Sequence, residues 1–449
     1  MRESHGKRLT VLVSAHEVSP VLGSECSSGW NVLTRLGEYH NIVVLHAETN
    51  QFGTNNYKEE IEKLWDQGEE NSVKFVSIPQ PNITKIIAGL NRLLSPAKTS
   101  VGIPPLYFLG VYFWERAVFR QAKWLMRSTQ FDLVHHFNHI SYREPGFLYK
   151  TGVPFIWGPV SGAFSLPLPF LSDRPFGFRV KFILRNFLSR WRNRFAVRIR
   201  NAARNASLIL YVTPGDKLFF ESKNCHHIQP SLDVGANVAF QSSDSTEAFS
   251  APQTDDFLRV LWVGRLDYIK SLDILLKALG GDEGLLSKVQ LTIVGDGELL
   301  NHYKAMAVEQ GIHNILWAGA VSNAEVFDFM KTADVLVHTS VKEAGSAVVL
   351  EALSVGLPVI CHDAFGFSYT ITESCGLKVP FKDPRESIQG FNRALWRCIN
   401  DPELVPSLKL GAKDRASNLS WDHLAKSIAI DYSNIISEHE SQCDQRLGS

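Results

Sequence analysis

The sequence predicts an α/β protein whose two domains are each built around a doubly wound parallel sheet. Short apolar runs with the length of buried strands alternate with amphipathic stretches along most of the 449 residues. The alternation stops at the polar stretch FQSSDSTEAFSAPQTDD and starts again after it. A chain of this length exceeds one ordinary core, so we expect one sheet on each side of a linker at 239–256.

The first domain, expected over residues 1–238, opens with a strand, a helix and a second strand. These segments are Leu9–Ala15, Gly29–Tyr39 and Ile42–His46. Parallel strands need such a crossover between them. Further strands are expected at Val73–Ile78, Leu133–His136, Phe155–Trp157 and Leu208–Val212.

The second domain, expected over residues 257–420, repeats this order of strands and helices. Its strands are expected at Leu258–Val263, Val289–Val294, Ile315–Trp317, Val335–His338 and Pro358–Cys361. Its helices are expected at Leu272–Leu279, Leu299–Gln310, Ala324–Thr332 and Ser346–Val355. Residues 421–449 carry a last amphipathic helix, which we expect to cross back to the first domain, although packing on either core would satisfy its pattern.

Composition and charge exclude several classes of function. The chain has 46 basic and 46 acidic residues, so no overall field attracts nucleic acid. Its six cysteines form no C-x-x-C pair, which is typical of free thiols in a reducing compartment. The N-terminus lacks the apolar core of a signal peptide, and no run of about 18 apolar residues is present. We therefore expect a cytoplasmic protein.

Two strand ends in the second domain carry candidate ligand-binding groups. After the strand ending at Val263 come Gly264 and Arg265, and Lys270 stands just before a helix. Glycine permits close backbone approach, while two cations at a helix N-terminus suit a diphosphate. The alternative is that both cations are surface charges or pair with Asp267 and Asp273.

The second of these strand ends carries Glu343, Gly345 and Ser346, followed by a helix that bears Glu351. Ser346 fits an N-cap, and the amides of Gly345 and Ser346 would point out of the helix start. Glu351 has apolar sequence neighbours, and a carboxylate there needs a partner. A solvated Glu343 and an exposed Glu351 are the alternative.

Taken together, the segments GRLDYIK, VGDGELL and ADVLVHTSVKEAGSAVVLEALSVGLPVI resemble the donor domain of glycosyltransferase family 4. The resemblance runs from Leu258 to about Val379, and the E-x7-E pair Glu343 and Glu351 is its most diagnostic part. It implies the GT-B fold, in which two Rossmann-like domains face a cleft, and a retaining transfer from a nucleotide-diphosphate sugar.

The resemblance also implies roles for individual residues. Arg265 and Lys270 would hold the donor diphosphate, with Gly264 allowing close approach. Glu343 would contact the donor sugar and Glu351 the ribose hydroxyls. The amides of Gly345 and Ser346 would line the sugar pocket. This chain departs from the family at Ala344 and Ser346, which affects the identity of the donor sugar. No D-x-D motif is placed to chelate a metal, so we expect neither a metal ion nor another cofactor.

The first domain carries a second motif, SPVLGSECSSGWN, which resembles a family subgroup with GSE-x3-GW. Gly23 would let this loop approach the donor phosphates, and Ser24 and Glu25 would contact donor or acceptor. A turn followed by a helix cap is the alternative for Ser24 and Glu25.

The expected acceptor-side histidine is missing from this sequence. Many family members place it after the strand that here continues as Ile156-Trp157-Gly158-Pro159. His136 and His139, which follow the preceding strand, are the candidate bases, although a lone histidine is more often a structural hydrogen-bonding group. The resemblance also allows a transfer without a protein base, in which the leaving diphosphate accepts the proton.

Residues 174–204 form a basic, aromatic segment without any acid. Val180, Leu184, Phe187, Trp191 and Phe195 recur at helical spacing between arginines, which suits a helix resting on an anionic membrane. A helix packed on the first domain is the alternative. The aromatic stretch 106–126 would widen such a surface. Nucleic acid is disfavoured, because no binding module accompanies the charge.

The expected function is transfer of a sugar to a glycan or lipid-linked acceptor in the synthesis of bacterial polysaccharide or cell-surface glycan. Such an enzyme would work in the cytoplasm or peripherally on the inner face of the cell membrane. Two alternatives are a GT-B isomerase acting on nucleotide sugars and a non-catalytic nucleotide-sugar-binding protein.

Overall fold

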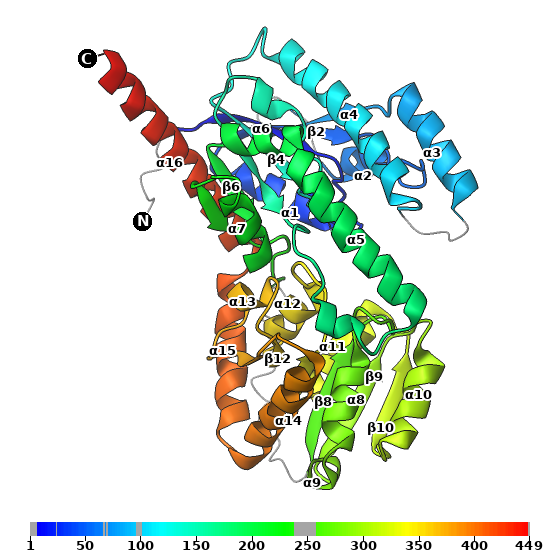
Figure 1. Cartoon of the computed structure of the whole chain (residues 1–449). Helices are drawn as coiled ribbons and strands as arrows, with labels where there is room; N and C mark the ends of the chain where they lie inside the picture. Colours follow the sequence, from blue (N-terminus) through cyan, green and yellow to red (C-terminus); the bar gives the residue numbers. More distant parts are fainter. Residues whose placement is uncertain are drawn as a thin grey trace. The chain divides into compact units, whose positions relative to one another are not determined.

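The computed structural model describes residues 7–23, 25–65, 68, 71–95, 101–237 and 257–447, with the side chains of 190–195 and 442–447 left out (Figure 1). The chain divides into two compact units. The first unit comprises residues 1–164, 195–234 and 421–449, and the second comprises residues 165–194 and 235–420.

The first unit is built on a seven-stranded parallel sheet with the order β3-β2-β1-β4-β5-β6-β7. Its strands are β1 (Thr10–Ala15), β2 (Asn41–Ala47), β3 (Val73–Ile78), β4 (Leu133–Asn138), β5 (Phe155–Val160), β6 (Leu208–Tyr211) and β7 (Ile228–Pro230). Its helices are α1 (Glu25–Leu36), α2 (Tyr57–Leu64), α3 (Asn82–Leu94), α4 (Pro104–Leu125), α6 (Val197–Asn205), α7 (Pro214–Glu221) and α16 (Trp421–Leu447), with a short 3-10 turn at Leu148–Lys150.

The second unit is built on a six-stranded parallel sheet with the order β10-β9-β8-β11-β12-β13. Its strands are β8 (Leu258–Val263), β9 (Val289–Val294), β10 (Ile315–Gly319), β11 (Val335–His338), β12 (Val359–His362) and β13 (Gly376–Val379). Its helices are α5 (Phe176–Phe195), α8 (Leu272–Gly280), α9 (Glu283–Leu286), α10 (Leu300–Glu309), α11 (Asn323–Thr332), α12 (Ala347–Ser354), α13 (Phe367–Thr370), α14 (Pro384–Asn400) and α15 (Leu404–Asn418), with a 3-10 turn at Leu168–Leu171.

Alternate strand residues face opposite layers of apolar side chains in the first sheet. On β4, Leu133 and Phe137 belong to the core that α1 and α16 cover, while Val134 belongs to the core on the α4 side. Strands buried on both faces read as near-continuous apolar runs. That burial explains why the short apolar runs of the sequence mark the strands.

The described structure divides the chain differently from the expected boundary at 238. Residues 165–194 lie within the predicted first domain, 1–238, but group with the second unit. Phe170 and Phe182 are buried in the second unit's core, and Arg174 forms a buried ion pair with Asp273 there. The expected linker, 239–256, lies outside the described residues.

The last helix belongs to the first unit. Trp421, Leu424, Ile428 and Tyr432 of α16 are buried in the same core as α1, the helix on which α16 packs. The chain thus returns to its first unit after completing the second.

The described residues also show the state of the cysteines and the character of the helices. Five cysteines are free and buried, while the side chain of Cys443 lies outside the described residues. Within the described parts of the chain, no helix combines the length and apolar character that a bilayer crossing requires.

Candidate functional site

Each sheet has a point where the direction of strand order reverses, between β1 and β4 in the first unit and between β8 and β11 in the second. In open α/β sheets, ligands bind beyond the carboxyl ends of the strands at such points. We therefore expect the functional residues to lie at these two pairs of strand ends.

The loop after β8 is held by the loop after β9. The Leu266 amide donates to the Asp296 carbonyl at 3.0 Å. Gly295 has φ +134°, and a Cβ atom there would lie 2.0 Å from the Gly264 carbonyl oxygen, so no other residue fits. Close backbone packing fixes the position from which Arg265 projects.

Arg265 points into solvent, with its side chain 69% exposed. Its Nε donates to the Asp267 carboxylate at 2.6 Å, and the other oxygen of Asp267 accepts the Lys270 amide at 2.9 Å. Asp267 therefore orients Arg265, and no hydrogen bond to the terminal guanidinium nitrogens of Arg265 occurs among the described residues. A guanidinium held by one edge can still bind an anion through the other.

Lys270 and Glu343 join the ends of β8 and β11. The Lys270 Nζ lies 2.6 Å from a Glu343 carboxylate oxygen, and the two side chains are 23% and 20% exposed. Asp273, the partner considered from the sequence, instead binds Arg174. The sequence thus placed both residues at strand ends, and the structure brings them into one ion pair.

The residues before α12 form a tight turn. The Gly366 amide donates to the Ala344 carbonyl at 2.9 Å, and a Cβ atom at Gly366 would approach that oxygen to 2.9 Å. Ser346 occupies the N-cap position, but its hydroxyl makes no cap hydrogen bond and lies 3.4 Å from His338 Nε2. Burial, with the charge of Lys270, holds the pKa of His338 well below its usual range.

Glu351 lies on α12 beside buried Leu350 and Ala352. Burial raises the pKa of its carboxyl group. Within the described residues, no hydrogen bond or ion pair reaches this carboxylate. A half-buried carboxylate without a protein partner suits a ligand that brings hydroxyl donors.

The corresponding strand ends of the first unit carry two buried histidines. His16 follows β1 and His139 follows β4, with ring centroids 6.0 Å apart. His16 is 1% and His139 7% exposed, and none of their ring nitrogens has a hydrogen-bond partner among the described residues. His16 was not among the predicted site residues, although its position directly after the first predicted strand indicates a place at the ligand-binding edge of the sheet.

Glu17 and Tyr107 complete this cluster. Glu17 Oε1 lies 3.8 Å from His16 Nδ1 and 3.4 Å from the Tyr107 hydroxyl. Burial raises the pKa of Glu17, but His16 and His139 outweigh that effect and hold it below the usual value. Burial, with repulsion from His16, lowers the pKa of His139 to about 4, so its ring is neutral near pH 7.

The described residues of the GSE-x3-GW motif make their contacts within the first unit, in part to the loop after β4. Glu25 begins α1 and accepts the Ile140 amide at 3.0 Å, while burial and the charge of Glu17 raise its pKa to about 8. A Cβ atom at Gly29 would lie 2.7 Å from the Glu17 carbonyl oxygen, so α1 can pack there only with glycine. Gly23 is exposed with open space around it, and Ser24 lies outside the described residues.

His136 lies below the strand end, inside the core. It is 1% exposed and its Nε2 bonds to the Glu144 carbonyl at 2.9 Å, while its Nδ1 lies 3.8 Å from Glu115. Burial and the neighbouring His139 lower its pKa to about 3. Of the two histidines considered from the sequence, only His139 stands at the carboxyl end of β4.

Comparison with known proteins gives a family match in the second unit. Residues 244–409 match the family model described as glycosyl transferases group 1. An uncharacterized glycosyltransferase, MJ1607, of Methanocaldococcus jannaschii is 26% identical over 54% of this chain and 60% of its own length. A D-inositol 3-phosphate glycosyltransferase of Streptomyces griseus is 29% identical over 43% and 42%. The chain thus spans about half the length of the curated relatives it matches.

Solved structures match nearly the whole chain. The Anabaena protein Alr3699/HepE, solved in complex with UDP, covers 95% of this chain and all of its own at a TM-score of 0.59 and 16% identity. The fold is GT-B. The lipopolysaccharide outer core galactosyltransferase WaaB shares it, with 96% of this chain covered, a TM-score of 0.58 and 19% identity. The segment 244–409 is thus similar to glycosyl transferases group 1, and the chain shares the fold of these solved structures.

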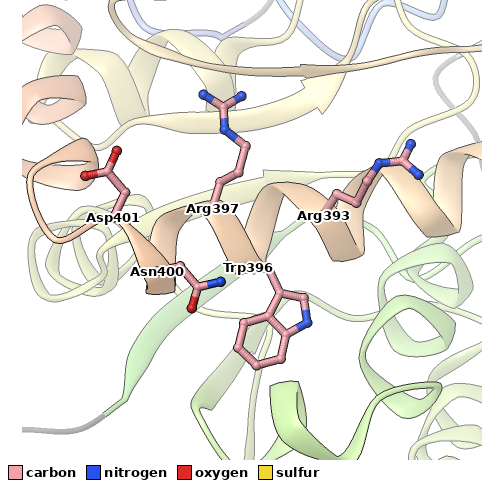
Figure 2. A pocket seen from close by; sticks show the side chains of 5 residues that line it. All are labelled: Arg393, Trp396, Arg397, Asn400 and Asp401. Carbon is pink, nitrogen blue, oxygen red and sulfur yellow. The ribbon is translucent and has the colours of Figure 1, made fainter.

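Two hollows on the surface of the second unit lie away from these strand ends. Figure 2 shows one on α14, where Arg393 and Arg397 project from one side of the helix and Trp396 and Asn400 from the other. Trp396 Nε1 donates to Asp282 at 2.7 Å, just before β9, so this hollow is at the edge where strands begin. That edge is opposite the one at which α/β folds bind ligands.

Among the described residues, no group of three or more His, Cys, Asp and Glu side chains could hold a metal ion. A polar cluster lies at each of the two reversals of strand order: Lys270 and Glu343 in the second unit, and His16, Glu17 and His139 in the first.

Proposed function

We propose that the protein is a retaining glycosyltransferase that moves a sugar from a nucleotide-diphosphate sugar to a glycan or lipid-linked acceptor. The synthesis of bacterial polysaccharide or cell-surface glycan would require this reaction. The observation that carries the proposal is the arrangement at the β8 and β11 ends, where an exposed Arg265, a Lys270–Glu343 pair and an unpartnered Glu351 lie in a segment matching glycosyl transferases group 1.

For the donor we propose a UDP sugar, which the Anabaena HepE complexes with UDP and UDP-glucose support. Arg265 and Lys270 would bind the diphosphate, and the loop at Gly264 would approach it. Glu343 would accept hydrogen bonds from the sugar once Lys270 turns to the phosphate. Glu351 would accept the ribose hydroxyls, which supply the donors that its half-buried carboxylate lacks.

The amides of Gly345 and Ser346 would line the sugar pocket at the start of α12. Ala344 and Ser346, at which the chain departs from the family, would then help select the donor sugar. Gly23, Ser24 and Glu25 of the first unit would supply further contacts to donor or acceptor.

In the transfer step, the bond between the sugar C1 and the diphosphate oxygen breaks while the acceptor oxygen bonds to C1 on the same face. The acceptor proton passes to the departing diphosphate oxygen. Arg265 and Lys270 would stabilise the charge that develops there, and positioning would supply the rest of the rate. This step uses neither a metal ion nor another cofactor.

The first unit would orient the acceptor. His139 is neutral near pH 7 and has free ring nitrogens among the described residues, so it can accept a hydrogen bond from an acceptor hydroxyl. His16 and Glu17 would position that hydroxyl. Buried His136 is a weaker candidate, because one ring nitrogen already bonds to a backbone carbonyl.

We also propose that the enzyme works in the cytoplasm, peripherally on the inner face of the cell membrane. The predicted surface, 174–204, is divided between the units: Arg174 is buried, whereas Val180, Leu184 and Phe187 of α5 are exposed. Trp191 and Phe195 lie outside the residues whose side chains are described. The absence of acidic residues from this segment favours its binding to an anionic surface.

The central test is the variant Glu351→Gln. Loss of the carboxylate should lower both the turnover of UDP-glucose and the affinity for UDP, measured by thermal stabilisation, at least tenfold. A tenfold change corresponds to about 1.4 kcal/mol of binding or transition-state energy. The melting temperature without ligand should stay the same or rise, because a half-buried charge without a partner is removed.

Glu373→Gln, at an exposed position of the same unit, serves as the matched control and should behave as wild type. If Glu351→Gln keeps both UDP stabilisation and turnover, the assigned donor site is wrong. UDP stabilisation without any turnover or donor hydrolysis would instead favour a non-catalytic binding protein.

A further inference from the structure

Helix α3 of the first unit exposes a continuous apolar stripe. Ile83, Ile86, Leu90, Leu93 and Leu94 are 42%, 67%, 45%, 81% and 54% exposed. Steps of three or four residues place them along one side of the helix, because an α-helix turns every 3.6 residues. Single exposed apolar residues need no explanation, but a continuous stripe marks a contact surface.

The stripe is distinct from the face that α3 already uses. Thr84, Ile87, Ala88 and Asn91 are buried, and the Thr84 hydroxyl donates to the Gly110 carbonyl of α4 at 3.2 Å. Asn91 accepts the Ile103 amide at 2.6 Å just before α4 begins. Figure 1 shows α3 beside α4, and the two packed helices, residues 82–94 and 104–125, form the α3–α4 hairpin. The core face of α3 is therefore satisfied without the stripe.

The charged residues of this hairpin are nearly all basic, although the net charge of the whole chain is zero. Residues 81–130 include one acid, Glu115, and it is fully buried. The cations of the same stretch that the structure describes are all exposed: Lys85, Arg92, Arg116, Arg120, Lys123 and Arg127. Trp124, 59% exposed, lies among them at the end of α4. Tryptophan favours the boundary between water and lipid.

We propose that the α3–α4 hairpin is a docking surface for an anionic lipid bilayer. The stripe would enter the boundary between headgroups and acyl chains, while the cations would bind anionic headgroups. A second copy of the chain fits poorly, because self-association would bring the same unscreened cations together. Nucleic acid would leave the apolar stripe in water.

This surface goes beyond the glycosyltransferase activity and does not depend on it. The hairpin includes most of the aromatic stretch 106–126, but the stripe on α3 is new, and both helices belong to the first unit, whereas 165–194 with α5 belongs to the second. None of the stripe residues belongs to the buried core of the first unit.

The test is sedimentation of the full chain with vesicles of phosphatidylcholine alone or mixed with phosphatidylglycerol. Wild type should bind the mixed vesicles, and high salt should weaken that binding. The double variant Ile86→Glu, Leu93→Glu should reduce vesicle binding at least tenfold, with an unchanged melting temperature and unchanged turnover of a water-soluble acceptor.

Leu218→Glu is the matched control, since Leu218 is 67% exposed on α7 of the same unit. It should bind vesicles as wild type does. Phe187→Glu on α5 should reduce binding less than the α3 double variant.

Three results would overturn the proposal. They are full vesicle binding by the α3 double variant, equal binding of wild type to phosphatidylcholine alone, and a dimer in sedimentation velocity that the double variant dissociates. Loss of turnover in Glu351→Gln with intact vesicle binding would separate a failure of this surface from a failure of the donor site.

Discussion

At the scale of single residues, burial decides which titratable groups are available for chemistry. His136 and Glu115 are both fully enclosed between β4 and α4, and neither Glu115 oxygen has a hydrogen-bond partner among the described residues. Burial, with the charge of Glu144, raises the pKa of Glu115 to about 8. His136, one of the two candidate bases named from the sequence, therefore forms part of a core together with Glu115.

Glu115→Gln tests this interpretation through pH. In the folded chain Glu115 keeps its proton up to about pH 8, whereas its ordinary pKa is 4.5. The unfolded chain therefore binds fewer protons in that window, so wild-type stability falls as pH rises through it. Urea unfolding should show the stability of Glu115→Gln relative to wild type rising by at least about 1 kcal/mol from pH 5 to pH 8.

The control Glu38→Gln, at an exposed position of the same unit, should follow the wild-type pH dependence. Parallel curves for Glu115→Gln and wild type would show that Glu115 ionises normally in the fold.

At the scale of elements, the segment leading into α5 shows how tertiary contacts divide a uniform sequence. Arg174 heads a run of basic residues, yet its guanidinium donates to Asp273 at 2.9 Å and to Ser271 at 2.8 Å. It also stacks over the Tyr268 ring at 5.3 Å. Arg179, a few residues later, is exposed. One arginine is thus a structural anchor, while others are available to an anionic surface.

Arg174→Met should destabilise the second unit by about 3–5 kcal/mol, because it leaves the buried Asp273 carboxylate without its cation. Arg179→Met should change stability by less than about 0.5 kcal/mol. Thermal unfolding of both variants measures the difference. A similar melting temperature for the two would mean that the Arg174–Asp273 pair does not hold 165–194 on the second unit.

At the scale of the whole molecule, the two units are discontinuous in sequence. Residues 165–194 serve the second unit, and residues 421–449 serve the first. Within α16, Tyr432 is fully buried and its hydroxyl lies 2.6 Å from His135 Nδ1. The first unit therefore needs the last helix to close its core.

Removal of residues 421–449 should unfold the first unit selectively. The truncated chain would expose the buried apolar face that α1 shares with α16, and the second unit keeps its own core. Calorimetry should show loss of one unfolding transition, while the transition stabilised by UDP remains. Two intact transitions in the truncated chain would contradict the role of α16.

Most of the fold could be predicted from the amino-acid sequence, because buried parallel strands carry an apolar signal that is local in the chain. Short strands at the sheet edges, β7 and β13, were missed, since runs of three or four residues give little periodic signal and those of β7 are also only partly buried. The position of the donor-side residues was equally local: Arg265, Lys270 and Glu343 lie in loops that follow predicted strands, and Glu351 lies in the predicted helix after the second loop.

Only the tertiary structure decided which charged side chains pair with one another and which are exposed. The sequence could not distinguish Lys270, paired with Glu343, from Arg174, buried against Asp273, because partners far apart in sequence meet only on folding. His16 joins His139 for the same reason, through the neighbouring strands β1 and β4. The sequence by itself determined two doubly wound sheets and which loops carry polar groups. The tertiary structure determined which of those groups are buried or paired, because burial and pairing depend on contacts between distant segments.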